Sequence, residues 1–128
     1  MTRTVHGVHP TVPLSAAVQA GDFLFLSGQV PFGPDGRLVP GDIAVQTRQV
    51  LENIAAVLGE VGASMEDVVK TTVWLTDAAD FAAFNSVYRE YFPSLPPARS
   101  CVVSLLAVDA RVEIEAIAHV AAGSPGGA

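Results

Sequence analysis

The 128-residue sequence has little of several residue types that commonly carry function, beginning with cysteine. Its only cysteine is Cys101, which excludes an internal disulfide and a CxxC metal or redox motif. The histidines do not have the i, i+4 spacing of a helical metal-binding pair; they are His6, His9 and His119. The only lysine, Lys70, fits a solvated or rim position on a strand better than a desolvated Schiff-base site. We therefore predict no metal site and no cofactor.

Positive charge is also scarce. Six arginines and one lysine are spread along the chain without a cluster, and the formal net charge is −6. Nucleic-acid-binding proteins take much of their affinity from lysine and arginine side chains that neutralise phosphates. Nucleic acid is therefore not an expected partner. A small substrate with one carboxylate remains compatible, because a single well-placed arginine can bind it.

Long apolar runs are missing, although the composition is apolar. No run approaches the roughly 20 residues of a membrane helix, and residues 1–10 lack the apolar core of a signal peptide. Half of the chain (50%) is nevertheless hydrophobic and only 16% is charged. A domain this small buries a limited share of its surface, so the surplus predicts a subunit interface. We expect a soluble, cytoplasmic homo-oligomer without membrane association, with one domain over residues 1–120 and a disordered tail at 121–128.

Two helices are predicted from hydrophobic periodicity. Residues 43–61 have apolar side chains at i, i+3, i+4 and i+7, with Asp42 as N-cap and Gly62 as the terminating residue. The polar side chains of this segment, Gln46 among them, fall mostly outside the stripe. A second helix begins near Asp77, and its inner stripe contains Phe81, Phe84, Tyr88 and Tyr91 or Phe92.

The remaining segments predict a mixed sheet. Short strands are expected on both sides of a Gly-Asp turn within residues 18–27, and longer ones at 68–75, 98–105 and 111–120. Helices with one apolar stripe each favour an α+β fold in which both helices lie on one face of the sheet. The opposite face needs cover too, since Val69, Val73, Leu75 and Ile117 cannot all face water. Oligomerisation would supply that cover.

The strongest functional signal is the run Pro97–Cys101, followed by glutamates at 113 and 115. Residues two apart on a strand share a face, so Arg99 and Cys101 point the same way. The planar guanidinium of Arg99 suits a ligand carboxylate, and Glu113 suits a water or a proton. An equally simple alternative is an Arg99–Glu113 pair that joins two strands.

The chain resembles the RidA/YjgF family, whose members are also called endoribonuclease L-PSP proteins. The resemblance rests on the run 97–101 with Glu113, on GDFLFLSGQ at 21–29, on VKTTV at 69–73, and on Phe84-Asn85 with Tyr88. It extends from about residue 13 to residue 120. It implies a chorismate-mutase-like fold and a homotrimer with ligand clefts between subunits.

The resemblance also implies roles for single residues. Arg99 would bind the carboxylate of a 2-imino or 2-enamino acid, Cys101 would contribute main-chain contacts, and Glu113 would position the attacking water. Ser27, Gly28 and Asn85 would line the same cleft. Each has a simpler alternative. Ser27 could cap a strand end, Gly28 could supply a bend, Asn85 could bond to local backbone, and Glu113 could lie on a solvated edge.

One site position departs from the family pattern. Where the family's deaminases usually carry a tyrosine after Gly-Pro, this chain has Leu14 within VPLS, which makes the pocket more apolar. The resemblance implies hydrolysis of 2-imino acids to 2-oxo acids and ammonia. The alternative, favoured by Leu14, is a non-catalytic trimer that binds small carboxylate metabolites such as 2-oxo acids. A ribonuclease is disfavoured by the acidic charge.

Overall fold

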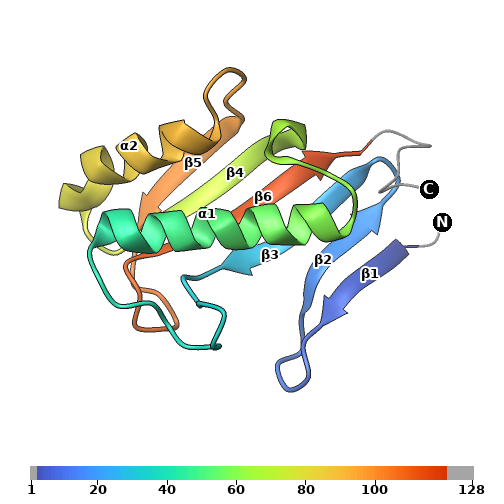
Figure 1. Ribbon diagram of the computed structural model, residues 1–128, viewed down its shortest axis with the longest axis horizontal. Helices are drawn as coiled ribbons and strands as arrows, with labels where there is room; N and C mark the ends of the chain where they lie inside the picture. The colour runs from blue at the N-terminus through green and yellow to red at the C-terminus, as the bar shows by residue number, and fades with distance from the viewer. Residues whose placement is uncertain (1–2, 121–128) are drawn as a thin grey trace.

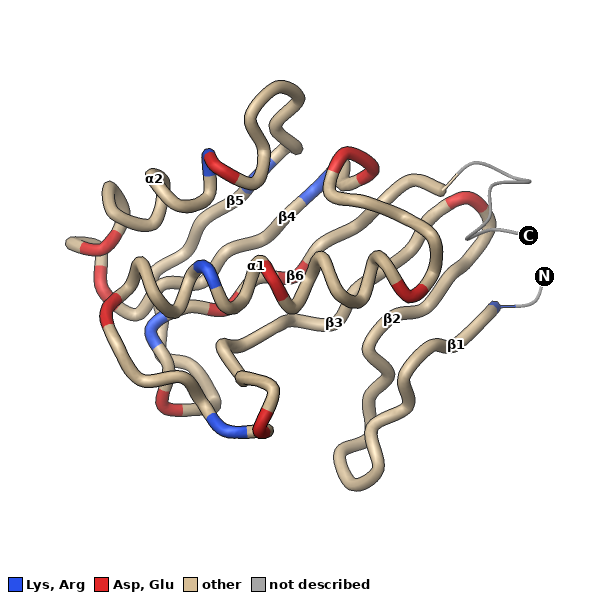
Figure 2. Tube along the Cα trace, viewed as in Figure 1, with Lys and Arg blue, Asp and Glu red and all other residues tan. Residues whose placement is uncertain are grey.

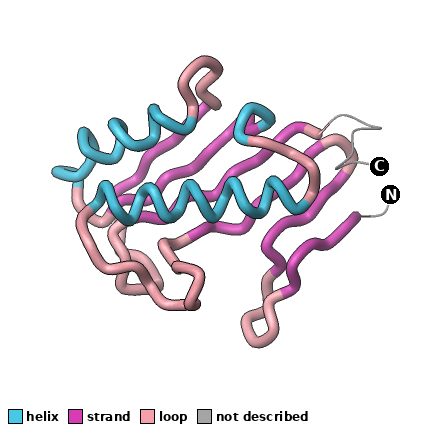
Figure 3. The backbone as a smooth tube through the Cα atoms, in the orientation of Figure 1, coloured by secondary structure: helices cyan, strands magenta, loops and turns pink. Residues whose placement is uncertain are grey.

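The protein folds into a single six-stranded sheet with two helices on one of its faces. The computed structural model describes residues 3–120, and the tail predicted at 121–128 lies outside them. The strands are β1 (Arg3–Val8), β2 (Ser15–Ala20), β3 (Phe23–Gln29), β4 (Val68–Leu75), β5 (Ala98–Val103) and β6 (Val112–His119). The helices are α1 (Ile43–Glu60) and α2 (Phe81–Tyr91), with short 3₁₀ turns at Met65–Asp67 and Ala78–Asp80. Figure 1 and Figure 3 show α1 and α2 side by side in front of the sheet.

The strands are arranged in the order β1-β2-β3-β6-β4-β5. β4 and β5 are parallel, and every other neighbouring pair is antiparallel. The predicted mixed sheet with both helices on one face is confirmed. β5 is an edge strand, and β4 lies between it and β6. The two closing strands of the sequence are therefore not paired with each other.

The ends of α1 follow their predicted signals. The Asp42 side chain accepts a hydrogen bond from the Val45 amide at 3.0 Å, which caps α1. Gly62 adopts φ +75°, a conformation that glycine tolerates after a helix end. The predicted start of the second helix near Asp77 was too early. Asp77 accepts from the Ala79 amide at 2.9 Å and caps a 3₁₀ turn, and α2 begins only after that turn, at Phe81.

Strand alternation separates a helix-covered face from an open face. Leu24 and Leu26 of β3 are buried under the helices. The prediction was wrong for Val73 and Leu75, which also lie on the helix-covered side and are fully buried. Ile117 lies on the open face, because it alternates with the buried Ala116 and Ala118 of β6.

Two side chains of the helices also differ from the predicted pattern. Gln46 is buried, and it remains polar there because Nε2 donates to the Val39 carbonyl at 2.9 Å and Oε1 accepts from the Arg111 amide at 2.8 Å. Phe81 is 44% exposed although it was placed in the inner stripe, because it lies at the first residue of α2, beside an arginine of the edge strand.

Strand β1 was not predicted. Its sequence, RTVHGV, has no apolar alternation, and nearly all of it is exposed. Gly7 adopts φ +65°, which interrupts a regular strand pattern. Pairing with β2 gives this segment its strand conformation, which is a long-range effect that local propensity does not report.

The open face of the sheet carries large apolar side chains. Val5, Phe23, Phe25 and Val102 are each between 42% and 46% exposed in the single chain. Neither helix in the described part of the chain is long and apolar enough to cross a membrane.

Candidate functional site

Arg99 of the edge strand β5 lies against α2 on the helix-covered side of the sheet. Its register partner on β4 is the buried Thr71, so both side chains point toward the helices. Nη1 of Arg99 donates to Oδ1 of Asn85 at 2.8 Å. The predicted Arg99–Asn85 proximity is thus found within one chain, and Asn85 uses its side chain for the arginine rather than for local backbone only.

Three aromatic rings of α2 surround the guanidinium. The Arg99 Cζ lies 4.9 Å from the ring centroid of Tyr88 and 5.6 Å from those of Phe81 and Phe84. Rings at this distance attract a cation without neutralising its charge. Within residues 3–120, the ion pairs are Arg48–Glu90 and Arg111–Asp80. Arg99 is therefore held in position while its charge has no carboxylate partner in the described chain.

Cys101 lies beside Arg99 on the same side of β5, as predicted. Its register partner on β4 is the buried Val73, and the thiol is partly buried against the core. Burial raises the pKa of Cys101, and the nearby Arg99 charge only partly opposes this. The thiol is therefore protonated at neutral pH, which does not favour nucleophilic chemistry.

Glu113 lies on the open face of the sheet, against Gly28 of β3. It is half-buried, and its pKa is raised by burial and, to a lesser degree, by the Glu115 charge. β3 has a bulge here: the three-residue step from Leu26 to Gln29 lies opposite the two-residue step from Ala116 to Ile114 on β6. A side-chain carbon added at Gly28 would meet Oε2 of Glu113. Gly28 thus makes room for the Glu113 carboxylate.

Ser27 belongs to the same bulge, and its side chain forms a hydrogen bond to β2. Its Oγ donates to the Ser15 carbonyl at 2.5 Å. Leu14 directly precedes Ser15 at the start of β2 and is 45% exposed. The predicted residues Leu14, Ser27, Gly28 and Glu113 are therefore brought together by β2, β3 and β6.

The structure contradicts the simple pairing of Arg99 with Glu113. Glu113 is the register partner of Trp74 on β4, whereas Arg99 is the partner of Thr71, and these two β4 residues point to opposite faces. β4 also separates the two strands. One chain thus presents two half-sites. The arginine half-site consists of Asn85, Arg99 and Cys101, and the glutamate half-site consists of Leu14, Ser27, Gly28 and Glu113.

A cavity of about 400 Å³ opens at the arginine half-site, between α2 and the segment that leads into β5. Asn85, Tyr88, Arg89 and Arg99 contribute polar groups, and Phe92 with the prolines of the 93–97 segment forms apolar walls. No carboxylate lines this cavity. It suits a small anionic molecule with an apolar part.

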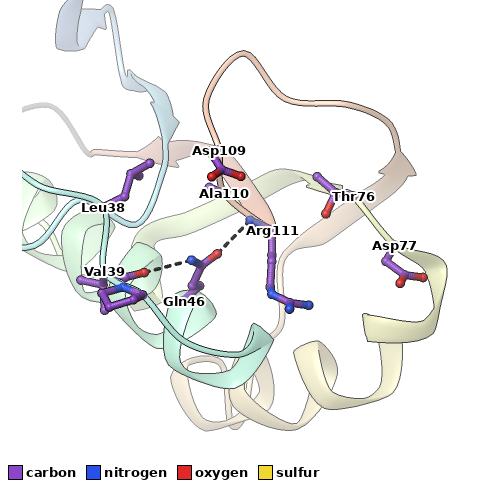
Figure 4. Close-up of a pocket in the computed structure, with 9 residues that line it drawn as sticks. Leu38, Val39, Gln46, Thr76, Asp77, Asp109, Ala110 and Arg111 are labelled. Carbon is purple, nitrogen blue, oxygen red and sulfur yellow. Dashed lines mark hydrogen bonds between the residues drawn. The ribbon is translucent and has the colours of Figure 1, made fainter.

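A larger cavity, of about 610 Å³, lies elsewhere and contains none of the predicted site residues. It is formed by the loops that precede α1, α2 and β6. Figure 4 shows Gln46 in its wall, hydrogen-bonded on one side to Val39 and on the other to Arg111. Both polar atoms of the Gln46 side chain are already hydrogen-bonded to these loops, so Gln46 connects the loops to α1 and is not available to a ligand.

Sequence reasoning missed two features of the arginine half-site. The rings of Phe81, Phe84 and Tyr88 were assigned to the core stripe only, although they also contact Arg99. Arg89 was not singled out. Its position four residues after Asn85, on the same helix face, is a signal that could have identified it.

Charge and metal-ligand patterns agree with a site for a small organic anion. Figure 2 shows the lysine and arginine positions spread over separate elements of the chain. Within residues 3–120, no three His, Cys, Asp or Glu side chains come close enough to hold a metal ion.

Known proteins resemble this chain over nearly its full length. The model of the family described as Endoribonuclease L-PSP matches residues 4–120. A RutC family protein of Pyrococcus horikoshii is 52% identical over 118 residues, which cover 91% of this chain and 94% of that protein. A Rid family protein of Yersinia pestis has a crystal structure with a TM-score of 0.85 at 42% identity, covering 93% of this chain and 100% of the other. A YjgF family member from Neisseria meningitidis has a TM-score of 0.83 at 33% identity, covering 94% and 97% of the two chains. These matches cover nearly the whole chain in both sequence and fold, and the chain therefore belongs to the RidA/YjgF family.

Proposed function

We propose that this protein is a deaminase that hydrolyses 2-imino acids, or their enamine tautomers, to 2-oxo acids and ammonia. The observation that carries the proposal is Arg99, a guanidinium without a carboxylate partner in the described chain. Asn85 and the Tyr88 ring hold it beside a small cavity. Such a group binds a substrate carboxylate with two parallel hydrogen bonds and fixes its orientation.

The glutamate half-site supports the second part of the reaction. The raised pKa of Glu113 moves this carboxylate closer to the range in which it can exchange protons with water. Gly28 leaves space directly beside it. In the proposed reaction Glu113 orients a water molecule and accepts its proton while the water oxygen attacks the imine carbon.

The two half-sites imply an assembly. Since Arg99 and Glu113 point to opposite faces of one sheet, a site that uses both must take them from two different chains. The exposed apolar side chains of the open face, such as Phe25 at 46%, offer a surface for that contact. We propose the homotrimer of the family, with one site at each contact between subunits.

The chemistry needs little beyond orientation. Water adds to the C=N carbon, the resulting amino alcohol loses ammonia, and a C=O bond replaces the C=N bond. An imine is already electrophilic, so an anchored carboxylate and a held water are sufficient. No covalent step is assigned to Cys101, whose thiol remains protonated.

Leu14 favours one alternative function. Its apolar, 45% exposed side chain offers no hydroxyl to the glutamate half-site. A trimer that binds small 2-oxo acids without turnover would not need that hydroxyl. Cleavage of RNA, which the family's description names, has less support. A chain with a net charge of −6 and dispersed arginines lacks the phosphate-binding surface that such a reaction uses.

The test is ammonia-releasing hydrolysis of 2-iminopropanoate and 2-iminobutanoate, generated in situ by an amino-acid oxidase. We expect the wild-type protein to accelerate it, and Arg99→Ala to lose on the order of 100-fold in kcat/KM, since a hydrogen-bonded charge contributes about 3 kcal/mol. Arg37→Ala, in an exposed turn, is the matched control and should retain full activity.

Two outcomes would contradict the proposal. Full activity of Arg99→Ala would show that the carboxylate anchor lies elsewhere. No acceleration by the folded wild-type protein, together with saturable binding of 2-oxo acids, would establish the non-catalytic alternative.

A further inference from the structure

Arg89 places a second guanidinium-bearing side chain on the wall of the cavity beside Arg99. It lies in the last turn of α2, four residues after Asn85, which puts both side chains on one face of the helix about 5–6 Å apart at their Cβ atoms. Asn85 in turn accepts the hydrogen bond from Arg99 at 2.8 Å. The helix therefore sets Arg89 one turn beyond the residue that positions the carboxylate anchor.

The charged side chains that line this cavity are all positive. Its lining contains two arginines and no carboxylate, although the whole chain has a net charge of −6. Arg89 belongs to neither of the two ion pairs found in residues 3–120. The adjacent Glu90 is already engaged, because both of its carboxylate oxygens accept hydrogen bonds from Arg48, at 3.0 and 3.2 Å.

The cavity also has an apolar side, formed by Phe92 and the prolines at 93, 96 and 97, and the Arg89 side chain is exposed and accessible to a ligand. A ligand with one carboxylate would engage Arg99 and leave Arg89 without a partner. A ligand with a second anionic group would engage both.

We propose that Arg89 determines substrate specificity by binding the distal carboxylate of a dicarboxylic 2-imino acid. Arg99 binds the carboxylate next to the imine. This inference rests on the proposed function and names its substrate class: the four- and five-carbon imines formed by oxidation of acidic amino acids, and the matching 2-oxo diacids. A simpler role for Arg89 is to stabilise the C-terminal end of α2 through the helix dipole, and that role would not discriminate between ligands.

The test measures binding of freshly prepared 2-oxo acids, which last much longer in water than the imines, so that it does not depend on turnover. Oxaloacetate, 2-oxoglutarate and 2-oxobutanoate are titrated by calorimetry into the wild-type protein, Arg89→Gln and the control Arg37→Gln. We expect wild type to bind at least one diacid about tenfold more tightly than 2-oxobutanoate, as one additional charged hydrogen bond allows. Arg89→Gln should abolish this preference by lowering the affinity for the diacid about tenfold more than the affinity for 2-oxobutanoate, and Arg89→Lys should restore part of it. The preference should also shrink at high salt.

Several results would overturn the inference. These are equal affinity of wild type for mono- and diacids, an equal loss of both affinities in Arg89→Gln, and the same change in Arg37→Gln. Tighter binding of phosphoenolpyruvate than of either diacid would assign the second group as a phosphate rather than a carboxylate. Unchanged melting temperatures of the variants exclude loss of the fold as the cause.

This experiment separates the inference from the proposed function. If the protein hydrolyses neither 2-iminobutanoate nor the dicarboxylic imines of the acidic amino acids but shows an Arg89-dependent preference for 2-oxo diacids, the assigned role of Arg89 in binding stands and the deaminase fails. If it hydrolyses 2-iminobutanoate and shows no such preference, the inference fails alone.

Discussion

At the residue scale, the proposed role of Glu113 depends on the absence of a side chain at Gly28. Gly28 lies in the β3 bulge, and its φ is not in the left-handed region, so backbone conformation does not demand glycine there. The demand comes from the neighbour, because any Cβ would occupy the place of the Glu113 carboxylate. From the sequence, Gly28 could be interpreted as a bend, whereas in the structure it leaves room for the carboxylate of Glu113.

We predict that Gly28→Ala reduces imine hydrolysis while the protein remains folded. The added methyl group meets the end of a flexible side chain, so the carboxylate moves aside and the backbone does not. A displaced water-binding group should lower kcat/KM on the order of 10- to 100-fold. The control is Gly59→Ala in α1, where an added Cβ meets nothing within 4 Å. Equal activity of the two variants would argue against a role for the Glu113 position.

At the element scale, a buried hydrogen bond connects the sheet to α2 below the arginine half-site. The hydroxyl groups of Thr71 on β4 and Tyr88 on α2 lie 2.7 Å apart, and both residues are buried. The same Tyr88 ring lies 4.9 Å from the Arg99 Cζ. The Thr71–Tyr88 hydrogen bond that joins α2 to the sheet therefore also holds the Tyr88 ring beside the Arg99 guanidinium.

We predict that Tyr88→Phe and Thr71→Val each destabilise the protein by about 1–3 kcal/mol, since each substitution leaves the buried hydroxyl of the other residue without its hydrogen-bond partner. The double variant should lose less than the sum, by about 0.5–3 kcal/mol. Urea denaturation of the four proteins measures this cycle. Ser86→Ala, which removes an exposed hydroxyl on the same helix, should change stability by less than about 0.5 kcal/mol. Strict additivity of the two substitutions would show that the hydroxyls do not interact.

At the scale of the whole molecule, the two faces of the sheet differ in how far they are covered within one chain. The helices cover one face of the central strands, so that Val73 and Ile114 have no exposed surface. The other face leaves Phe23 and Phe25 more than 40% exposed beside the glutamate half-site. Assembly through that face would bury these rings, and in the proposed trimer such contacts bring half-sites of different chains together.

We predict that Phe25→Asp dissociates the assembly and abolishes hydrolysis with it. The substitution places a charge on an apolar contact surface, whose burial would then be strongly unfavourable. The control is Val45→Asp, at 44% exposure on the outer side of α1. Light scattering after size-exclusion chromatography should give a trimer for wild type and Val45→Asp and a monomer for Phe25→Asp. An active wild-type monomer would refute the shared site.

Many of the helices and strands could be predicted from the sequence, because the signals that define them lie within a few residues of each element. Asp42 and Gly62 delimit α1 by hydrogen bonding and backbone conformation, and alternation locates Leu24 and Leu26 on one face of β3. Strand β1 could not be predicted this way, since only its partner β2 stabilises it. Gln46 was misplaced for a related reason: its buried amide is satisfied by loops distant in sequence.

The sequence by itself determined the family, the α+β architecture and the identity of the residues that carry the proposed chemistry, because motifs, periodicity and caps act over short distances. Only the tertiary structure decided how these residues are grouped. The insertion of β4 between β5 and β6 places Arg99 and Glu113 on opposite faces, which no spacing between positions 99 and 113 could reveal. The packing of α2 on β5 likewise brings Arg89 to the cavity of Arg99, because strand order and helix placement are long-range properties of the fold.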